Sequence, residues 1–132
     1  MAKAKKAKQL TFSMPDRAGL LSDITAVIAE AKVNINAICA YAMENKAFFM
    51  MITESNARAK KALGKINISP QEEDVLMVEM PNTVGSLHRA AKKIADAGVN
   101  INYLFATAAS GRTSTCVLNT SDDKKALRAV SK

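Results

Sequence analysis

The sequence is poor in the residue types on which most catalytic and metal sites depend. Among 132 residues it has no tryptophan, two cysteines, one histidine and only 5% aromatic residues. Cys39 and Cys116 form no CxxC motif and His88 stands alone, so no metal site is predicted. No nucleophile lies beside a base, because Ser86 and His88 point in different directions on a helix. The sequence therefore predicts a protein that is not an enzyme, has no cofactor, and keeps its thiols reduced in the cytoplasm.

Long apolar runs are also absent. The longest, Ala37–Met43 and Ala47–Ile52, have the length of strands, so no membrane span is predicted. The lysine-rich start continues into polar residues, which argues against a signal peptide. Four of the net +7 charges lie in residues 1–8, which we interpret as a disordered basic tail: Lys3, Lys5, Lys6 and Lys8. The remaining +3 gives no reason to expect nucleic-acid binding, although an accessory protein that uses the tail stays an alternative.

What the sequence does contain is an internal repeat with an offset of 66 positions. The segment Met14–Leu21 (MPDRAGLL) returns as Met80–Leu87 (MPNTVGSL), and Val33–Asn36 (VNIN) returns unchanged as Val99–Asn102. The two copies align without a gap. Because this period is too long for a solenoid unit, the repeat predicts two copies of one small domain.

Each copy, at residues 9–70 and 71–132, has the pattern of a β-α-β-β-α unit. Leu21, Ile24 and Ile28 have helical spacing and follow a short strand, and two further strands are joined by a tight turn. Residues 66–69 offer a closing strand to the first copy, whereas the second copy has no room for one. The predicted class is therefore α+β, with two tandem ferredoxin-like βαββαβ units, the second lacking its last strand.

Two features predict a homodimer. Strands such as Ala47–Ile52 do not alternate between apolar and polar residues, which is typical of strands buried on both faces. The missing last strand would leave an open sheet edge, and open edges pair with other chains.

The turn from the first strand into the first helix is the candidate binding site. A glycine in this turn precedes a helix N-terminus, whose free N–H groups and dipole suit a carboxylate. Nearby asparagines can donate and accept, which suits the two charged groups of an amino acid. The alternative is that the glycines only permit the turn and the asparagines only satisfy backbone groups.

The sequence Asp-x-x-Gly-Leu-Leu, an amphipathic helix and Val-Asn-Ile together resemble an ACT domain, and the resemblance covers nearly the whole chain. It implies a stand-alone tandem ACT protein. ACT domains are regulatory modules that typically bind amino acids, often at interfaces between paired domains. Asn82, Gly85 and Asn100 match the asparagine–glycine–asparagine set of the serine-sensing dehydrogenase domains. The corresponding residues of the first copy match the commoner Asp form of the motif: Asp16, Gly19 and Asn34.

The sequence departs from the family pattern at one position. The residue before the glycine is usually proline in the family, but Ala18 and Val84 stand there, so the turn is less rigid. The Asn82 turn should bind better than the Asp16 turn, because the charge of Asp16 repels a carboxylate.

The predicted function is sensing of a small amino acid and reporting it to a regulated enzyme or regulator protein. A structural or oligomerisation module without a ligand is the alternative, and neither nucleic acid nor membrane is a predicted partner. The candidate ligand-binding residues are Asp16, Arg17, Ala18, Gly19, Leu20, Asn34, Ile35, Asn82, Thr83, Val84, Gly85, Ser86, Asn100 and Ile101.

Overall fold

The computed structural model describes residues 2–108 and 110–132, which form four helices and six strands of an α+β fold. The chain divides into two compact units. The first unit comprises residues 8–73. The second unit comprises residues 74–132 together with the N-terminal residues up to Ala7.

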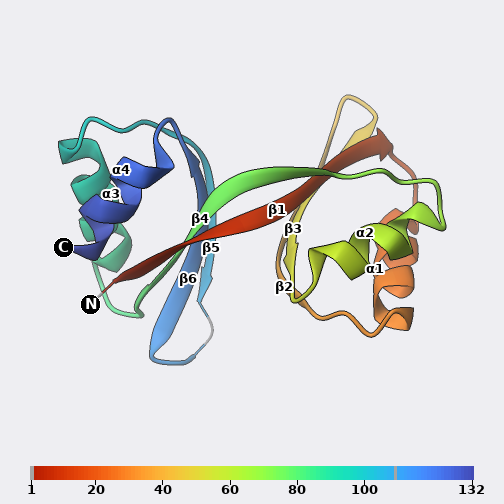
Figure 1. Cartoon of the computed structure of the whole chain (residues 1–132), viewed down its shortest axis with the longest axis horizontal. Coiled ribbons are helices and arrows are strands. Elements are labelled where there is room, and N and C mark those ends of the chain that lie inside the picture. The colour runs from red at the N-terminus through yellow and green to blue at the C-terminus, as the bar shows by residue number, and fades with distance from the viewer. Residues whose placement is uncertain (1, 109) are drawn as a thin grey trace. The chain divides into compact units, whose positions relative to one another are not determined.

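The first unit has the order expected of a βαββαβ domain. Its elements are β1 (Lys3–Pro15, from Lys8 onward), α1 (Leu20–Glu30), β2 (Ile35–Met43), β3 (Lys46–Thr53), α2 (Asn56–Gly64) and the start of β4 (Gln71–Pro81). β3 lies between β1 and β2 and is antiparallel to both. The helices α1 and α2 lie together beside these strands (Figure 1), and both contribute to a single core.

The core of the first unit explains which face of α1 is buried. Leu20, Ile24 and Ile28 repeat every four residues and are at most 7% exposed. They pack with the inward residues of β1 and β3, including Phe12 and Phe49, whose rings stack 5.1 Å apart. Leu20 begins this buried face instead of Leu21, the residue that the helical spacing in the sequence includes, since Leu21 is 49% exposed.

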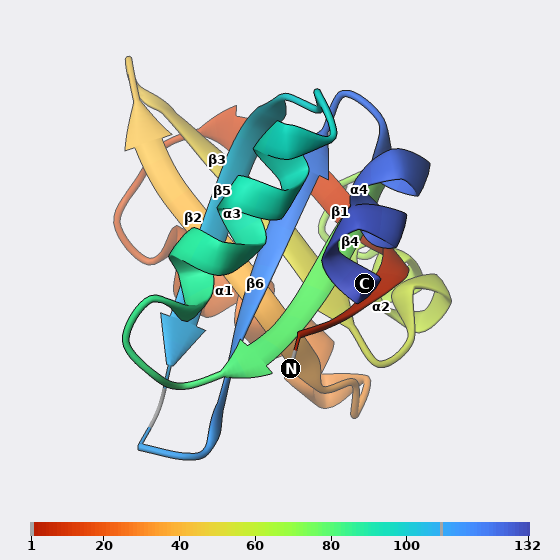
Figure 2. The ribbon, with the colours of Figure 1, turned by 90° about the vertical axis from the view of Figure 1, so that its left-hand side faces the viewer.

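The second unit repeats this arrangement. It contains most of β4, then α3 (Ser86–Asp96), β5 (Ile101–Ala108), β6 (Thr113–Thr120) and α4 (Asp123–Ser131). Its strands follow the order β1-β4-β6-β5, with the N-terminal part of β1 at one edge. Figure 2 shows α3 and α4 side by side in front of these strands, and a second core lies between the helices and the sheet.

The prediction of a disordered basic tail at residues 1–8 differs from the structure, because Lys3–Ala7 is an edge strand beside β4 (residue 1 lies outside the described residues). Ala2 and Ala4 pack against the core of the second unit, while Lys3 and Lys5 are exposed. This alternation is that of a strand, and lysines on an edge strand oppose pairing with other chains. The edge that the second copy was predicted to leave open is therefore filled by this segment.

The two copies are not gapless, because the second hairpin has one extra residue. Leu10 pairs with Met51 and its repeat counterpart Leu76 pairs with Leu118, so beyond the hairpin the offset is 67 instead of 66. The first hairpin turns tightly at Glu44 and Asn45, both of positive φ, as a two-residue type I′ turn requires.

The predicted closing strand at residues 66–69 is not a strand. The amides of Ile66 and Ile68 donate to Leu63 O, and that of Asn67 donates to Gly64 O, so this segment closes the end of α2. Strand β4 begins only at Gln71, after Pro70. In the part of the chain that is described, no helix has the length and apolar character needed to cross a membrane.

The edge strand can be tested by substituting two neighbouring residues with the same amino acid. Ala4→Asn places an amide against the second core and should lower the free energy of unfolding by about 1–2 kcal/mol. Lys5→Asn changes an exposed side chain of the same strand and should cost no more than about 0.5 kcal/mol. Urea denaturation measures both free energies of unfolding. Equal, negligible effects of the two substitutions would indicate that residues 1–8 are a disordered tail.

Candidate functional site

Both glycine turns have the same backbone geometry. Gly19 and Gly85 have φ values of 83° and 85° and immediately precede α1 and α3. This left-handed conformation strains any residue with a Cβ, which is why glycine stands at both positions. Each turn forms a backbone hydrogen bond to the neighbouring hairpin. The amide of Asp16 donates to Asn45 O at 2.9 Å, and that of Asn82 donates to Arg112 O at 2.8 Å.

The helices that follow the glycines have no side-chain cap, whereas the other two helices have one. Ser55 accepts the amide of Arg58 at the start of α2, and Asp122 accepts that of Lys125 at the start of α4. No side chain caps α1 or α3, where the first helical bonds run to the carbonyls of Gly19 and Gly85. Both helix starts therefore present backbone N–H groups and the positive end of the helix dipole to a ligand.

The first turn has a net negative charge. Arg17 pairs with Asp23 at 2.6 Å, and both side chains are 56% exposed. The same guanidinium donates to Ala18 O at 3.3 Å. The turn borders an open cavity of about 270 Å³ that residues of β2 and β3 line on its other side. With Asp16 also on the turn, the nearby charges sum to −1, which disfavours an anionic guest.

The second turn carries the opposite charge. Arg89 occupies the repeat position of Asp23, and its guanidinium folds back over the turn to bond Ser86 Oγ (3.1 Å) and Val84 O (3.4 Å). Ser86 Oγ, in a residue only 7% exposed, also lies 2.9 Å from Thr83 Oγ1. No acidic side chain pairs with Arg89 among the described residues. Sequence reasoning missed this residue, although the 66-residue offset places it directly on Asp23.

Two other residues of the second turn have different roles. The side-chain amide of Asn82 donates to Gly111 O at 3.1 Å and so ties the turn to the hairpin. Val84 is 99% exposed, so its side chain lies in solvent.

The asparagines that open the second strand of each copy lie away from the glycine turns. The amide of Asn34 donates to Glu54 Oε1 at 2.9 Å, and that of Asn100 donates to Ser121 Oγ at 3.0 Å. α1 has 11 residues, about 16 Å of helix, and it separates Gly19 from Asn34. Within one unit the structure therefore does not bring the predicted glycine and asparagine together. The following residues, Ile35 and Ile101, are half-buried and pack against the two cores.

Cys116 is not a candidate nucleophile. Cys116 is buried, and this burial raises the pKa of its thiol to about 11 despite a backbone hydrogen bond to Val78 that lowers it. The thiol is therefore protonated and unreactive at neutral pH. Over residues 2–108 and 110–132, no group of three metal-ligating side chains is found.

Comparison with known proteins finds an ACT domain at residues 8–70. No curated protein matches the chain. Protein BT0572 from Bacteroides thetaiotaomicron has a similar structure, with 25% identity, a TM-score of 0.89, and coverage of 97% of this chain and 88% of that one. The regulatory subunit of aspartate kinase from Thermus thermophilus, in a ligand-free form, has 17% identity and a TM-score of 0.68, covering 98% and 94%. The same subunit from Thermus flavus has 17% identity and a TM-score of 0.63, covering 99% and 94%. These subunits share the fold with this chain.

Two glycine-to-valine substitutions test the strain at the second turn. In Gly85→Val the valine must adopt a positive φ, and its Cβ would lie 3.0 Å from the Arg89 guanidinium. We expect a loss of about 1–3 kcal/mol in the free energy of unfolding. Gly111→Val is the control, because an added Cβ there meets nothing within 4 Å, and it should cost about 0.5 kcal/mol or less. Thermal denaturation with similar losses for both variants would show that the Gly85 conformation is not specially required.

Proposed function

We propose that this chain is a tandem ACT protein that binds a small amino acid at its glycine turns. The observation that carries the proposal is the uncapped helix start behind a left-handed glycine, which occurs once in each copy. The first of these turns lies inside the matched ACT domain at residues 8–70. The repeat and the shared backbone geometry support a second ACT domain in the remainder of the chain.

The second turn is the better site for the ligand carboxylate. The amides of Leu87 and His88 lie at the start of α3, beyond the reach of its internal hydrogen bonds. Arg89 adds a positive charge over the same turn, where the first copy has the Arg17–Asp23 ion pair. A carboxylate is therefore attracted by the second turn more than by the first.

The asparagines at the strand starts would contact a ligand bound at the glycine turn of a second chain. Because Asn100 lies at the other end of α3 from Gly85, one unit cannot place both against a single small ligand. A site that used both would take its turn from one chain and its asparagine from another. This agrees with the ACT resemblance, which implies ligands at interfaces between paired domains.

The edge strands support such a homodimer. β2 (INAICAYAM) and β5 (INYLFATA) are the outer strands of their units and contain no charged residue. Ile38 and Met43 of β2 are 38% and 56% exposed. An uncharged edge strand with exposed apolar side chains pairs readily with another chain. The edge left by the missing last strand of the second copy gives no support to a dimer, since Lys3–Ala7 fills it.

The proposed role is regulatory, in a cytoplasmic protein that reports the amino acid to an enzyme or regulator protein. The aspartate kinase regulatory subunits from two Thermus species support this role, because they have this fold at nearly the same chain length. The alternative of a nucleic-acid accessory protein loses its premise, since the lysines lie on a strand instead of a mobile tail. A structural module without a ligand is the competing function. Thermal shift with each of the twenty amino acids distinguishes the two, because a ligand at 100 times its Kd adds about 2.7 kcal/mol of stability.

Titration calorimetry of turn variants tests the site. With the amino acid that gives the largest thermal shift, Asn82→Ala should lose more affinity than Asp16→Ala. Arg89→Gln should weaken binding at least about tenfold, as expected for loss of a charge-assisted contact. Lys92→Gln is the control, because it removes the same charge from the same helix but from a side chain paired with Asp96. A larger loss for Asp16→Ala than for Asn82→Ala would move the site to the first turn.

Light scattering tests the dimer. We expect a mass of twice 14.2 kDa at concentrations of about tens of micromolar, in the usual range for a specific homodimer. Ala40→Lys adds a charge to the exposed edge of β2 and should shift the protein toward monomer. The control is Ala57→Lys, at an exposed position of α2 away from this edge. A parent protein that scatters as a monomer in this range would contradict the homodimer.

A further inference from the structure

In the first unit, β1 has β3 on one side and the start of β4 on the other, and β4 begins only at Gln71. The amide of Asp16 donates to Asn45 O, across from β1 toward the β3 side. Hydrogen-bonded pairs alternate along an antiparallel ladder, so Met14 and Phe12 also direct their N–H and C=O groups toward β3. The backbone groups of Ser13, between them, therefore point to the opposite edge.

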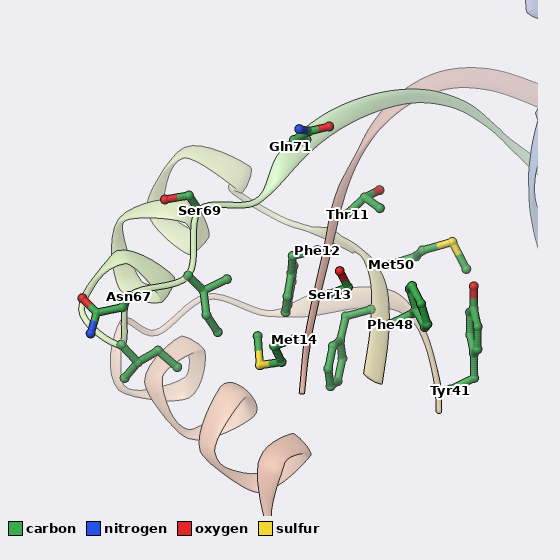
Figure 3. A pocket seen from close by; sticks show the side chains of 13 residues that line it. Thr11, Phe12, Ser13, Met14, Tyr41, Phe48, Met50, Asn67, Ser69 and Gln71 are labelled. Carbon is green, nitrogen blue, oxygen red and sulfur yellow. The ribbon is translucent and has the colours of Figure 1, made fainter. Parts of the chain in front are cut away.

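The segment before β4, residues 66–70, forms no strand along this edge. Residues 66–68 use their amides to close the end of α2, and Pro70 has no amide to donate. A cavity of about 660 Å³ lies along β1 beside this segment. Figure 3 shows Phe12 and Met14 pointing from β1 toward the side on which Asn67 and Ser69 lie, with Phe48 and Tyr41 on the other side of the strand. We call this cavity the β1 groove.

The internal repeat shows what fits such a groove. The repeat counterparts of Ser13 and Met14 are Glu79 and Met80 on β4. In the second unit this edge is covered by the chain's own N-terminal strand: Lys3 and Lys5 lie against Met77 and Glu79, and Ala2 lies against Met80. This edge of β4 thus accommodates an extended peptide in the second copy. In the first copy β4 begins only at Gln71, so the end of the β1 edge at Ser13 has no strand beside it.

We propose that the β1 groove binds an extended, uncharged peptide segment of a partner protein, which adds a strand beside Ser13. Main-chain hydrogen bonds to Ser13 would supply the affinity, as in other complexes formed by strand addition. A peptide suits this groove better than a compact small molecule, because it alone offers N–H and C=O groups at the spacing of a strand edge.

Charge and polarity define the peptide further. None of the 13 residues that line the groove is charged, although the chain as a whole has a net charge of +7. In the second unit the lysines of the covering strand lie beside Glu79, whereas the equivalent Ser13 is neutral. The guest should therefore alternate apolar residues, toward Met14 and Ile66, with uncharged polar residues, toward Thr11 and Ser13.

The first experiment uses the full-length protein and two synthetic probes. Acetyl-Thr-Val-Thr-Val-Thr-amide represents the proposed guest, and acetyl-Lys-Ala-Lys-Ala-Lys-amide represents the charged strand of the second unit. In ¹⁵N NMR titrations the neutral peptide should shift the amides of residues 11–14 and 66–69, with a Kd of about 1 mM or tighter. The lysine peptide should bind at least about tenfold more weakly. No shift at these residues with the neutral peptide, or equal binding of both peptides, would overturn the proposal.

The second experiment removes one backbone donor and uses the repeat for its control. Ser13→Pro removes an amide that faces away from β3, so the melting temperature should fall by no more than about 3 °C while peptide affinity falls at least about tenfold. Ser13→Ala keeps the amide and should bind as the parent does. Glu79→Pro removes the equivalent amide where the edge is covered, and should lower the melting temperature by about 5–10 °C.

Two further results with these variants would overturn the proposal. If Ser13→Pro is destabilised as strongly as Glu79→Pro, the Ser13 amide is already bonded within the chain. If Ser13→Pro is folded and binds the neutral peptide as tightly as the parent, the peptide is not held by this strand edge.

Discussion

The hydrogen bonding along β1 is the constraint on which the rest of the structure depends. β1 is a single strand, Lys3–Pro15, that belongs to both units. Its residues up to Ala7 form an edge strand of the second unit, and its residues from Lys8 onward include the part that pairs with β3 in the first unit. Each unit alone is near the lower size limit for an independent core, so a strand supplied from a distant part of the sequence matters to its stability. Because β4 begins only at Gln71, the Ser13 end of β1 has no second strand beside it in the first unit, which is the origin of the β1 groove.

Much of this fold could be predicted from the repeat, because glycine turns, helical spacing and VNIN motifs depend on local backbone preferences. The glycines before α1 and α3 follow from the same local chemistry, since both have a positive φ. The strand at Lys3–Ala7 could not be predicted in this way. Its Ala/Lys alternation is weak evidence alone, and its partner β4 lies about 70 residues further along the chain, so pairing depends on long-range contacts. The extra residue in the second hairpin could not be recognised from the sequence, because a serine follows Ser55 at the repeat offset of 66, at Ser121. The structural counterpart of Ser55, the residue that caps α4, is instead Asp122, at an offset of 67.

The candidate site shows a similar division between local and long-range information. The sequence correctly indicates two equivalent turns, but the charges that distinguish them come from Asp23 and Arg89, one helical turn beyond the motif. The two turns thus keep one backbone and differ in electrostatics, which allows two copies of one domain to have different affinities for an anion. Asn34 and Asn100 were grouped with the glycines because they belong to the same family motif, whereas the intervening helix places them at its opposite end.

Amide hydrogen exchange across β1 tests the central claim most directly. The account predicts alternation at the start of the chain: the amides of Lys5 and Ala7 point toward β4 and should be protected, while those of Ala4 and Lys6 point to solvent and should exchange at nearly the rate of an unfolded peptide. In the first unit the Ser13 amide should exchange quickly although its neighbours Phe12 and Met14 are protected. Uniformly fast exchange from Lys3 to Ala7, or strong protection of Ser13, would contradict the account.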